Sequence, residues 1–282
     1  MAADHRAIDC WVNVTMGDSV PPEFLQRVKD DYFKGGDDFF KSLTPDETIE
    51  AMDQAGVERA VLVVEARRPS AKILEFVERF PDRFFLAAMI DPTKGMRPLW
   101  ALREMVEEYP VIMAKAVPFG IDVAPSDAVY YPLYATCVEL DLPLTINTGL
   151  PGPPMPGECQ HPIHLDRVCY RFPELRVVMA HGADPWWDVA IRLMIKYANL
   201  SLMTSAYSPK YFPDELIHFM NTRGQDKVMF SSDHPVLSMQ RCISEAEQLD
   251  LRDGVLDKFL RANADRVFFA ERDPHPRKSY LR

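Results

Sequence analysis

Long apolar runs, a signal-peptide pattern and paired cysteines are all missing from this sequence. No stretch of about 18 apolar residues occurs, which argues against a membrane span. The opening residues MAADHRAIDC lack the apolar core of a secretory signal. The five cysteines are odd in number and contain no CxxC pair, so neither a disulfide framework nor a cysteine-based structural zinc site is expected. We therefore predict a cytoplasmic protein with no membrane partner.

Basic charge is also scarce. Lys and Arg number 32 against 42 Asp and Glu, which gives a net charge of −10. Nucleic-acid binding needs basic patches that face phosphates, so no nucleic-acid partner is expected. A small anionic substrate stays compatible with this charge, because a few local Arg or Lys side chains can hold it. No GxGxxG or Walker motif follows the first predicted strand, which argues against a Rossmann fold.

The sequence does contain eight short apolar or β-branched runs. Continuous apolar runs are typical of parallel strands that are buried on both faces. We predict strands at 7–14, 59–64, 83–90, 111–117, 143–147, 175–181, 199–204 and 227–233.

Helical periodicity fills the segments between these runs. Thr44-Pro45-Asp46-Glu47 is a capping box with Pro at the first helical position, and Gly56 ends that helix. Strand and helix alternating eight times predict an α/β protein with one (β/α)8 TIM barrel over residues 1–282. The other predicted helices cover 69–80, 96–109, 131–140, 163–172, 186–197, 213–222, 237–248 and 254–262.

Two long loops are predicted at one end of this barrel. The segment 15–43 separates the first strand from its helix and carries Phe24, Tyr32, Phe33, Phe39 and Phe40. We predict that it covers the barrel mouth as a lid. The segment 148–161 is rich in Pro and Gly and also belongs to the mouth, although a purely structural loop explains its composition equally well.

Polar residues at the C-terminal ends of barrel strands are typical of catalytic and ligand-binding sites. Taken strand by strand, these are Trp11 and Asn13, Glu65 with Arg67 and Arg68, Asp91, Lys115, Asn147, His181, Thr204 with Ser205, and Asp233 with His234.

Several stretches of the chain resemble the amidohydrolase-2 branch of the metal-dependent hydrolases, which includes aminocarboxymuconate-semialdehyde decarboxylase-like proteins. The likeness is dense from Pro143 onward and looser before it. Its motifs are FPELRVVMAHG at 172–182, TSA at 204–206, NTRG at 221–224, SDHP at 232–235, and Asn263-Ala264 with RVF at 266–268. The resemblance implies a barrel enzyme that acts on a small molecule, and it implies a possible homodimer.

The same resemblance implies a divalent metal held by a His-x-His pair on the first strand, His residues on the fifth and sixth, and an Asp on the eighth. This sequence has Trp11 and Asn13 at the first pair and Asn147 at the fifth-strand position, so only His181 and Asp233 match. Catalytic zinc usually has three protein ligands. We therefore predict no cofactor. The alternative is a zinc-type metal on His181 and Asp233, completed by His234 or a substrate oxygen.

Asp233 and His181 are the predicted catalytic pair. Asp233 would act as a general base toward water, and His181 as an acid or oxyanion donor. The alternative is that the two side chains bond each other and the barrel rim as a remnant of a metal site.

The predicted substrate-binding residues are Trp11, Asn13, Arg67, Lys115, Asn147, His161 and His234. Amide groups can donate to a carbonyl or carboxylate, and a bidentate Arg suits a carboxylate. Arg67 can equally be a solvated residue before its helix. Lys115 is harder to explain structurally, because it ends an apolar strand where a charge is costly.

Three functions remain open at this point. The first is hydrolysis or decarboxylation of a small, carboxylated carbonyl compound, with lactone hydrolysis as the hydrolytic form. The second is a catalytically silent barrel that binds a small ligand or a partner protein. The third is a conventional metal-dependent hydrolase with unusual ligands.

Overall fold

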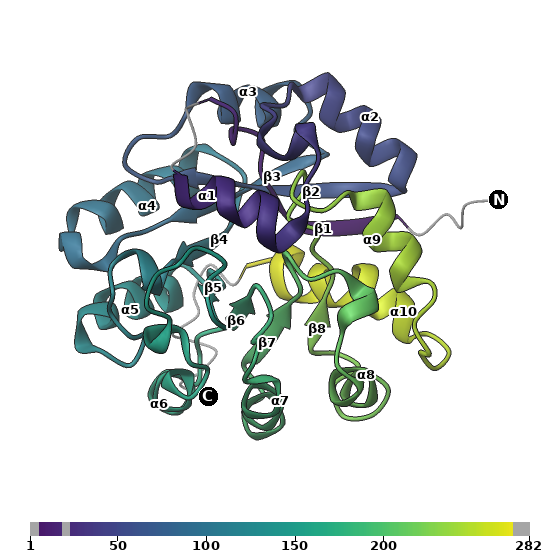
Figure 1. Ribbon diagram of the computed structural model, residues 1–282. Helices are drawn as coiled ribbons and strands as arrows, with labels where there is room; N and C mark the ends of the chain where they lie inside the picture. Colours follow the sequence, from purple (N-terminus) through teal and green to yellow (C-terminus); the bar gives the residue numbers. More distant parts are fainter. Residues whose placement is uncertain (1–5, 19–22, 273–282) are drawn as a thin grey trace.

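Eight parallel strands lie side by side in the order of the chain, β1 to β8. The computed structural model describes residues 6–18 and 23–272 (Figure 1). The ring closes where Val12 pairs with His234 and where the Cys10 amide donates to the Phe230 carbonyl oxygen at 3.3 Å. The predicted TIM barrel is confirmed. The strands are β1 Ala7–Val12, β2 Val57–Glu65, β3 Phe84–Met89, β4 Val111–Ala116, β5 Leu144–Asn147, β6 Val177–Ala180, β7 Leu200–Met203 and β8 Val228–Met229.

The predicted helices form around the strands (Figure 1). At the start of α2, Thr44 and Glu47 form the predicted capping box and Gly56 ends the helix at a φ of 72°. No described helix combines the length and hydropathy needed to cross a bilayer. The helices are α1 Glu23–Arg27, α2 Pro45–Ala55, α3 Ala71–Arg79, α4 Arg97–Glu108, α5 Tyr131–Glu139, α6 His164–Arg171, α7 Trp187–Lys196, α8 Asp214–Met220, α9 Met239–Ala246 and α10 Val255–Asp257.

Two predictions about element boundaries were wrong near the C-terminus. The strand expected over 227–233 keeps only two residues in the ladder, because the chain beyond it turns to bond β1. The helix expected over 254–262 is a short α-helix followed by π-helical turns at Lys258–Ala262 and Asp265–Phe269.

The apolar core has two parts, because alternate residues of a strand face opposite sides. One part packs the outer strand faces against the helices and includes Leu144 and Ile146. The other fills the barrel interior with Ile8, Val61, Met113 and Val178, among others. At the N-terminal end of the barrel, Ala264, Val267 and Phe268 join this interior cluster. That end is therefore closed by apolar packing.

The segment expected to act as a lid forms α1, a π-helical turn at Val28–Phe33 and a 3-10 turn at Asp37–Phe40. The rings of Phe33 and Phe39 lie 5.7 Å apart between centroids. Residues 19–22 and the Phe24 side chain, which the prediction also included, lie outside the described part of the structure.

Candidate functional site

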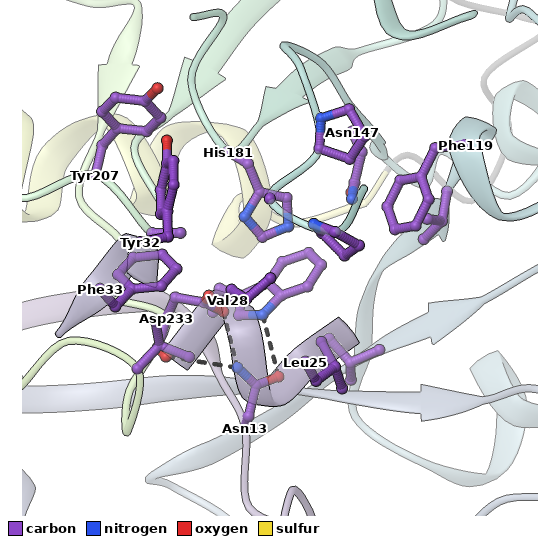
Figure 2. Close-up of a pocket in the computed structure, with 18 of the residues that line it drawn as sticks. Asn13, Leu25, Val28, Tyr32, Phe33, Phe119, Asn147, His181, Tyr207 and Asp233 are labelled. Carbon is purple, nitrogen blue, oxygen red and sulfur yellow. Dashed lines mark hydrogen bonds between the residues drawn. The ribbon is translucent and has the colours of Figure 1, made fainter. Parts of the chain in front are cut away.

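A cavity of about 420 Å³ opens at the C-terminal ends of the strands. This volume lies in the range typical of small-molecule sites. Its walls are mostly apolar and come from the lid and from the loops after β4, β5 and β7 (Figure 2). The polar residues that line it are Asn13, Lys115, Asn147, Thr148, Gln160, His181 and Asp233. The apolar wall includes Trp11, Leu25, Val28, Phe33, Phe39, Phe119, Leu150 and Tyr207.

Asp233 and Asn13 form the central polar contact of the cavity. Asn13 Nδ2 donates to Asp233 Oδ1 at 2.8 Å, and Asn13 Oδ1 accepts from Trp11 Nε1 at 3.2 Å (Figure 2). Burial raises the pKa of the Asp233 carboxyl to about 7, against the lowering effects of the Asn13 hydrogen bond and of Lys115. This carboxyl is therefore divided between its protonated and ionised forms near neutral pH.

Backbone geometry at the mouth fixes these side chains. His181, Ala206 and Asp233 follow β6, β7 and β8 with φ values of 65°, 63° and 66°. Left-handed backbone at a residue with a Cβ costs on the order of 1–3 kcal/mol and concentrates at functional sites. Three consecutive strand ends therefore carry this cost at the mouth.

A second buried carboxylate, Asp9 on β1, positions the end of β8. Its Oδ1 accepts from the Ser232 amide at 2.9 Å, and its Oδ2 accepts from the Ser232 hydroxyl. Burial raises the pKa of Asp9 to about 6. The sequence analysis missed Asp9, although an acidic residue inside an apolar run was a visible signal.

His181 is held as a neutral imidazole. Its ring packs edge-on against Trp11, with the two centroids 4.5 Å apart. Burial, followed by the nearby Lys115, lowers the pKa of His181 to about 3. The backbone amide of His181 donates to Ser205 Oγ at 3.0 Å, which fixes the turn after β6. His181 can therefore donate or accept a hydrogen bond at neutral pH without carrying charge.

Lys115 lies in the barrel interior on β4, one alternation beyond the core residue Met113. Its side chain is 3% exposed, and Nζ lies over the Trp11 ring, 2.6 Å from the centroid. Burial lowers the pKa of Lys115 well below its usual range, although Asp233 opposes that shift.

Two side-chain amides from the β5 region complete the polar lining. Asn147 Oδ1 and Gln160 Oε1 are both buried, and neither has a hydrogen-bond partner within residues 6–18 and 23–272. Gln160 Nε2 donates to the Gly149 carbonyl oxygen at 2.8 Å, which fixes the orientation of that amide. Gln160 was missed at the sequence level, because nothing in the Pro- and Gly-rich loop distinguished it from an exposed loop residue.

Three predicted binding residues do not line this cavity. Arg67 lines a neighbouring hollow of about 390 Å³, which shares Met89, Val117 and Phe119 with the main cavity. His161 stacks near Trp186, with centroids 4.4 Å apart, and its Nδ1 accepts from the Ile163 amide. The backbone of His234 bonds β1, with its carbonyl oxygen accepting from the Asn13 amide at 2.7 Å. A shared site of these residues with Asp233 therefore stays a prediction, and the walls of the cavity are formed by other residues.

Solved structures share this barrel. An uncharacterized TIM-barrel protein from Bordetella bronchiseptica is 23% identical, with 93% of this chain and 97% of that chain covered and a TM-score of 0.75. A dihydroxybenzoic acid decarboxylase from Polaromonas sp. JS666, with bound manganese and the inhibitor 2-nitroresorcinol, is 16% identical (95% and 98% covered, TM-score 0.65). A probable 2-pyrone-4,6-dicarboxylic acid hydrolase from Acinetobacter baumannii, with citric acid bound, is 17% identical (94% and 99% covered, TM-score 0.63). A comparison with curated protein sequences gives no match.

The manganese in the Polaromonas structure corrects one prediction. Trp11, Asn13 and Asn147 at three expected ligand positions led us to predict that the site has no cofactor. Several solved structures of this fold contain manganese, so that prediction was wrong. It judged these positions by zinc, for which amide side chains are weak ligands, whereas carbonyl-type oxygens are suitable ligands for manganese.

The cavity offers a donor set that suits such an ion. No group of three or more His, Cys, Asp or Glu capable of holding a metal occurs within residues 6–18 and 23–272. The orphaned Asn147 Oδ1, however, lines the same cavity as His181 and Asp233. Carboxylate, imidazole and amide oxygen together are acceptable ligands for manganese. Asp233, His181 and Asn147 are therefore the residues that would hold the cation.

The family assignment rests on a match that covers nearly the whole chain. The family profile Amidohydro_2, described as amidohydrolase, matches residues 8–270. This match covers β2 to β8 in full, β1 from its second residue, and every polar residue that lines the cavity. The chain belongs to the amidohydrolase family and is an enzyme of that superfamily.

Proposed function

We propose that this enzyme decarboxylates a small carboxylic acid. The observation that carries the proposal is Asp233, a buried carboxyl with a pKa of about 7 that faces a cavity with apolar walls. Decarboxylation leaves an electron pair on carbon, and that carbon needs a proton. A carboxyl group that still holds its proton near neutral pH is suited to supply it.

The surrounding side chains define how Asp233 would act. Asn13 Nδ2 occupies Oδ1, so the transferable proton belongs on Oδ2. The neutral His181 imidazole can hold a hydrogen bond to the substrate without competing for that proton. The lid residues Leu25, Val28 and Phe33 give the cavity an apolar wall, which would limit the contact of water with the carbon that receives the proton.

A divalent cation fits beside this arrangement. When bound by Asp233, His181 and Asn147, it would supply positive charge that stabilises negative charge on the substrate. A cation bound to Asp233 would favour the ionised carboxylate, so the pKa of about 7 and the proton-donor role describe Asp233 before the cation binds.

Hydrolysis of a lactone-type ester is the second candidate, favoured by the same pKa. At neutral pH about half of Asp233 is ionised, and that form can take a proton from an attacking water. The similar Acinetobacter structure is described as a dicarboxylic acid hydrolase. The two candidates have opposite pH dependences, because decarboxylation uses the protonated form of Asp233 and hydrolysis uses the ionised form.

Release of CO2 from a panel of small aromatic and oxo carboxylic acids tests the proposal. We expect release with the wild-type enzyme and, without added metal, a rate that falls as the pH rises through about 7. Hydrolysis of 2-pyrone-4,6-dicarboxylate without CO2 release, with a rate that rises through the same pH range, would establish the second candidate instead.

We also propose a cytoplasmic homodimer. The absence of cysteine pairs supports the compartment, and the family resemblance supports the dimer. Light scattering on the purified full chain would test the dimer, and a monomer at micromolar concentration would exclude it.

A further inference from the structure

Lys115 is a buried amine that the proposed proton transfer does not use. Its side chain lines the cavity and is 3% exposed. Within the described ranges no Asp or Glu forms an ion pair with it at 4.0 Å or less. Its Nζ lies against the face of Trp11, which also lines the cavity. An ammonium buried without a carboxylate partner is costly, so the neutral amine is the favoured form.

A neutral amine in an apolar cavity is a nucleophile toward carbonyl carbon. Exposed lysines are almost wholly protonated at neutral pH and react poorly. Desolvation removes that barrier, which is one recognised way in which enzymes activate lysine for imine formation. The inward position of Lys115, one alternation beyond Met113, makes the amine reachable from the cavity.

We propose that Lys115 forms an imine with a ketone or aldehyde carbon of the substrate, and that the substrate is therefore an oxo acid. This inference deepens the proposed decarboxylation and rests on it for the role of the carboxyl group. Imine formation itself does not depend on carbon dioxide release.

The reaction balances with one proton taken from solvent, which replaces the carboxylate lost as CO2. The Lys115 Nζ–carbon bond forms, the carbonyl oxygen takes up one proton from Nζ and one from solvent, and that oxygen leaves as water to give a protonated imine. In a 3-oxo acid the bond to the carboxylate then breaks, CO2 leaves, and its electron pair moves into the imine to give an enamine. The Asp233 carboxyl protonates the enamine carbon. Water then adds to the imine carbon, the ketone leaves, and Lys115 and Asp233 recover their starting states.

Borohydride trapping tests this chemistry directly. The manganese-loaded wild-type enzyme is mixed with acetoacetate or 2-formylbenzoate, reduced with sodium borohydride, and analysed by intact mass and peptide mapping. We expect a stable adduct on Lys115 with an occupancy at least about tenfold above that of any exposed lysine, because exposed amines are protonated. 3-Hydroxybutyrate, which has no ketone or aldehyde carbon, should give no adduct.

Two variants complete the test. Lys115→Met keeps the length of the side chain and should lose the adduct, whereas Lys94→Met, at a lysine with 62% side-chain exposure, should keep it. Peptide mapping of the wild-type enzyme gives the answer even if Lys115→Met does not fold. Absence of an adduct at Lys115 with both carbonyl probes would overturn the inference.

The mass of the acetoacetate adduct separates this inference from the proposed function. An adduct that retains the carboxyl group supports the imine, even if no substrate is ever decarboxylated. An acetone-derived adduct supports both ideas. Decarboxylation without any trapped adduct would support the proposed function and reject Lys115 as the nucleophile.

Discussion

Burial has opposite consequences for stability at the two ends of the barrel. At the N-terminal end, Val267 and Phe268 pack against the interior strand residues and leave an apolar plug. At the C-terminal end, Lys115 and Asp233 are equally buried, yet both have pKa values shifted toward their neutral forms. Burial of apolar side chains stabilises the fold at the N-terminal end. At the C-terminal end, burial of ionisable groups destabilises the fold, but it holds these groups in reactive forms in an apolar cavity. Substitutions at the two ends should therefore have opposite consequences.

The largest expected effect is on activity at the mouth. Asp233→Asn should lower kcat by about 10²–10⁴-fold, because the proton donor is lost. Stability at neutral pH should hold or rise. The folded-state pKa of Asp233 lies above its unfolded value, so the carboxyl destabilises the fold as pH rises from about 4 to about 7.

Asp82→Asn, at an exposed aspartate near the opposite end, is the matched control and should keep full activity. Steady-state kinetics and urea unfolding measure both quantities. Full turnover in Asp233→Asn would contradict the proposed role.

The opposite result is expected at the plug. Phe268 is 4% exposed, and Phe268→Ala should destabilise the fold by about 3–5 kcal/mol through cavity formation. Activity per folded molecule should be nearly unchanged, because no cavity-lining residue of the mouth is altered. Thermal unfolding and active-site titration would check this. A large fall in kcat at unchanged stability would contradict the view that the N-terminal end serves stability and the C-terminal end serves activity.

The effect expected on manganese affinity is intermediate in size. If Asn147 Oδ1 completes the donor set, Asn147→Ala should weaken manganese binding by roughly 10–100-fold, the scale reported for loss of groups that support a metal site. Metal analysis after equilibrium dialysis measures this without any assay of turnover. Gln160→Ala serves as the comparison, because it removes the other buried amide oxygen that lacks a partner among the described residues. This variant should retain manganese. Equal loss in both variants would reject Asn147 as a ligand.

Lys115→Met should make the protein more stable at neutral pH, by on the order of 1 kcal/mol or more, since an unpaired amine no longer has to be buried. The sign follows from linkage. The folded-state pKa of Lys115 is lowered, so at neutral pH the folded chain binds fewer protons than the unfolded chain, and the amine lowers stability there. The loss of stability that Lys115 causes becomes smaller as the pH rises toward the unfolded-state pKa of about 10.4. Urea unfolding of both proteins at pH 7 and pH 10 would show whether the difference narrows.

The smallest effect concerns Asn13. Its hydrogen bond lowers the pKa of Asp233, so Asn13→Ala should move the alkaline limb of the decarboxylation rate to higher pH by up to about one unit. The pH profile of kcat/KM measures the shift. A limb that moves to lower pH would show that Asn13 does not stabilise the ionised carboxylate.

Much of the barrel was predictable because its signals are local. The apolar runs and the capping box at Thr44 placed strands and helices within a few residues of their observed bounds. The exceptions lie near the C-terminus. There β8 is cut short because Ser232 and Asp233 leave the ladder to bond β1, a contact that spans more than two hundred residues.

The candidate site was only partly predictable. Strand ends identified Asn13, Lys115, Asn147, His181 and Asp233, since parallel strands bring their C-terminal ends to one face. The same rule grouped Arg67 and His234 with them, yet neither is among the residues that line the cavity. It also missed Gln160, whose loop folds back to Gly149.

The sequence by itself determined the order of strands and helices, the barrel and the family motifs, because these depend on hydrophobic periodicity and on short fixed spacings. Tertiary structure alone decided the chemistry of the mouth. A carboxyl with a pKa of about 7, a neutral imidazole and an unpaired buried amine arise from burial among residues distant in the chain. Desolvation depends on what surrounds a group in three dimensions, and no local pattern of residues records it.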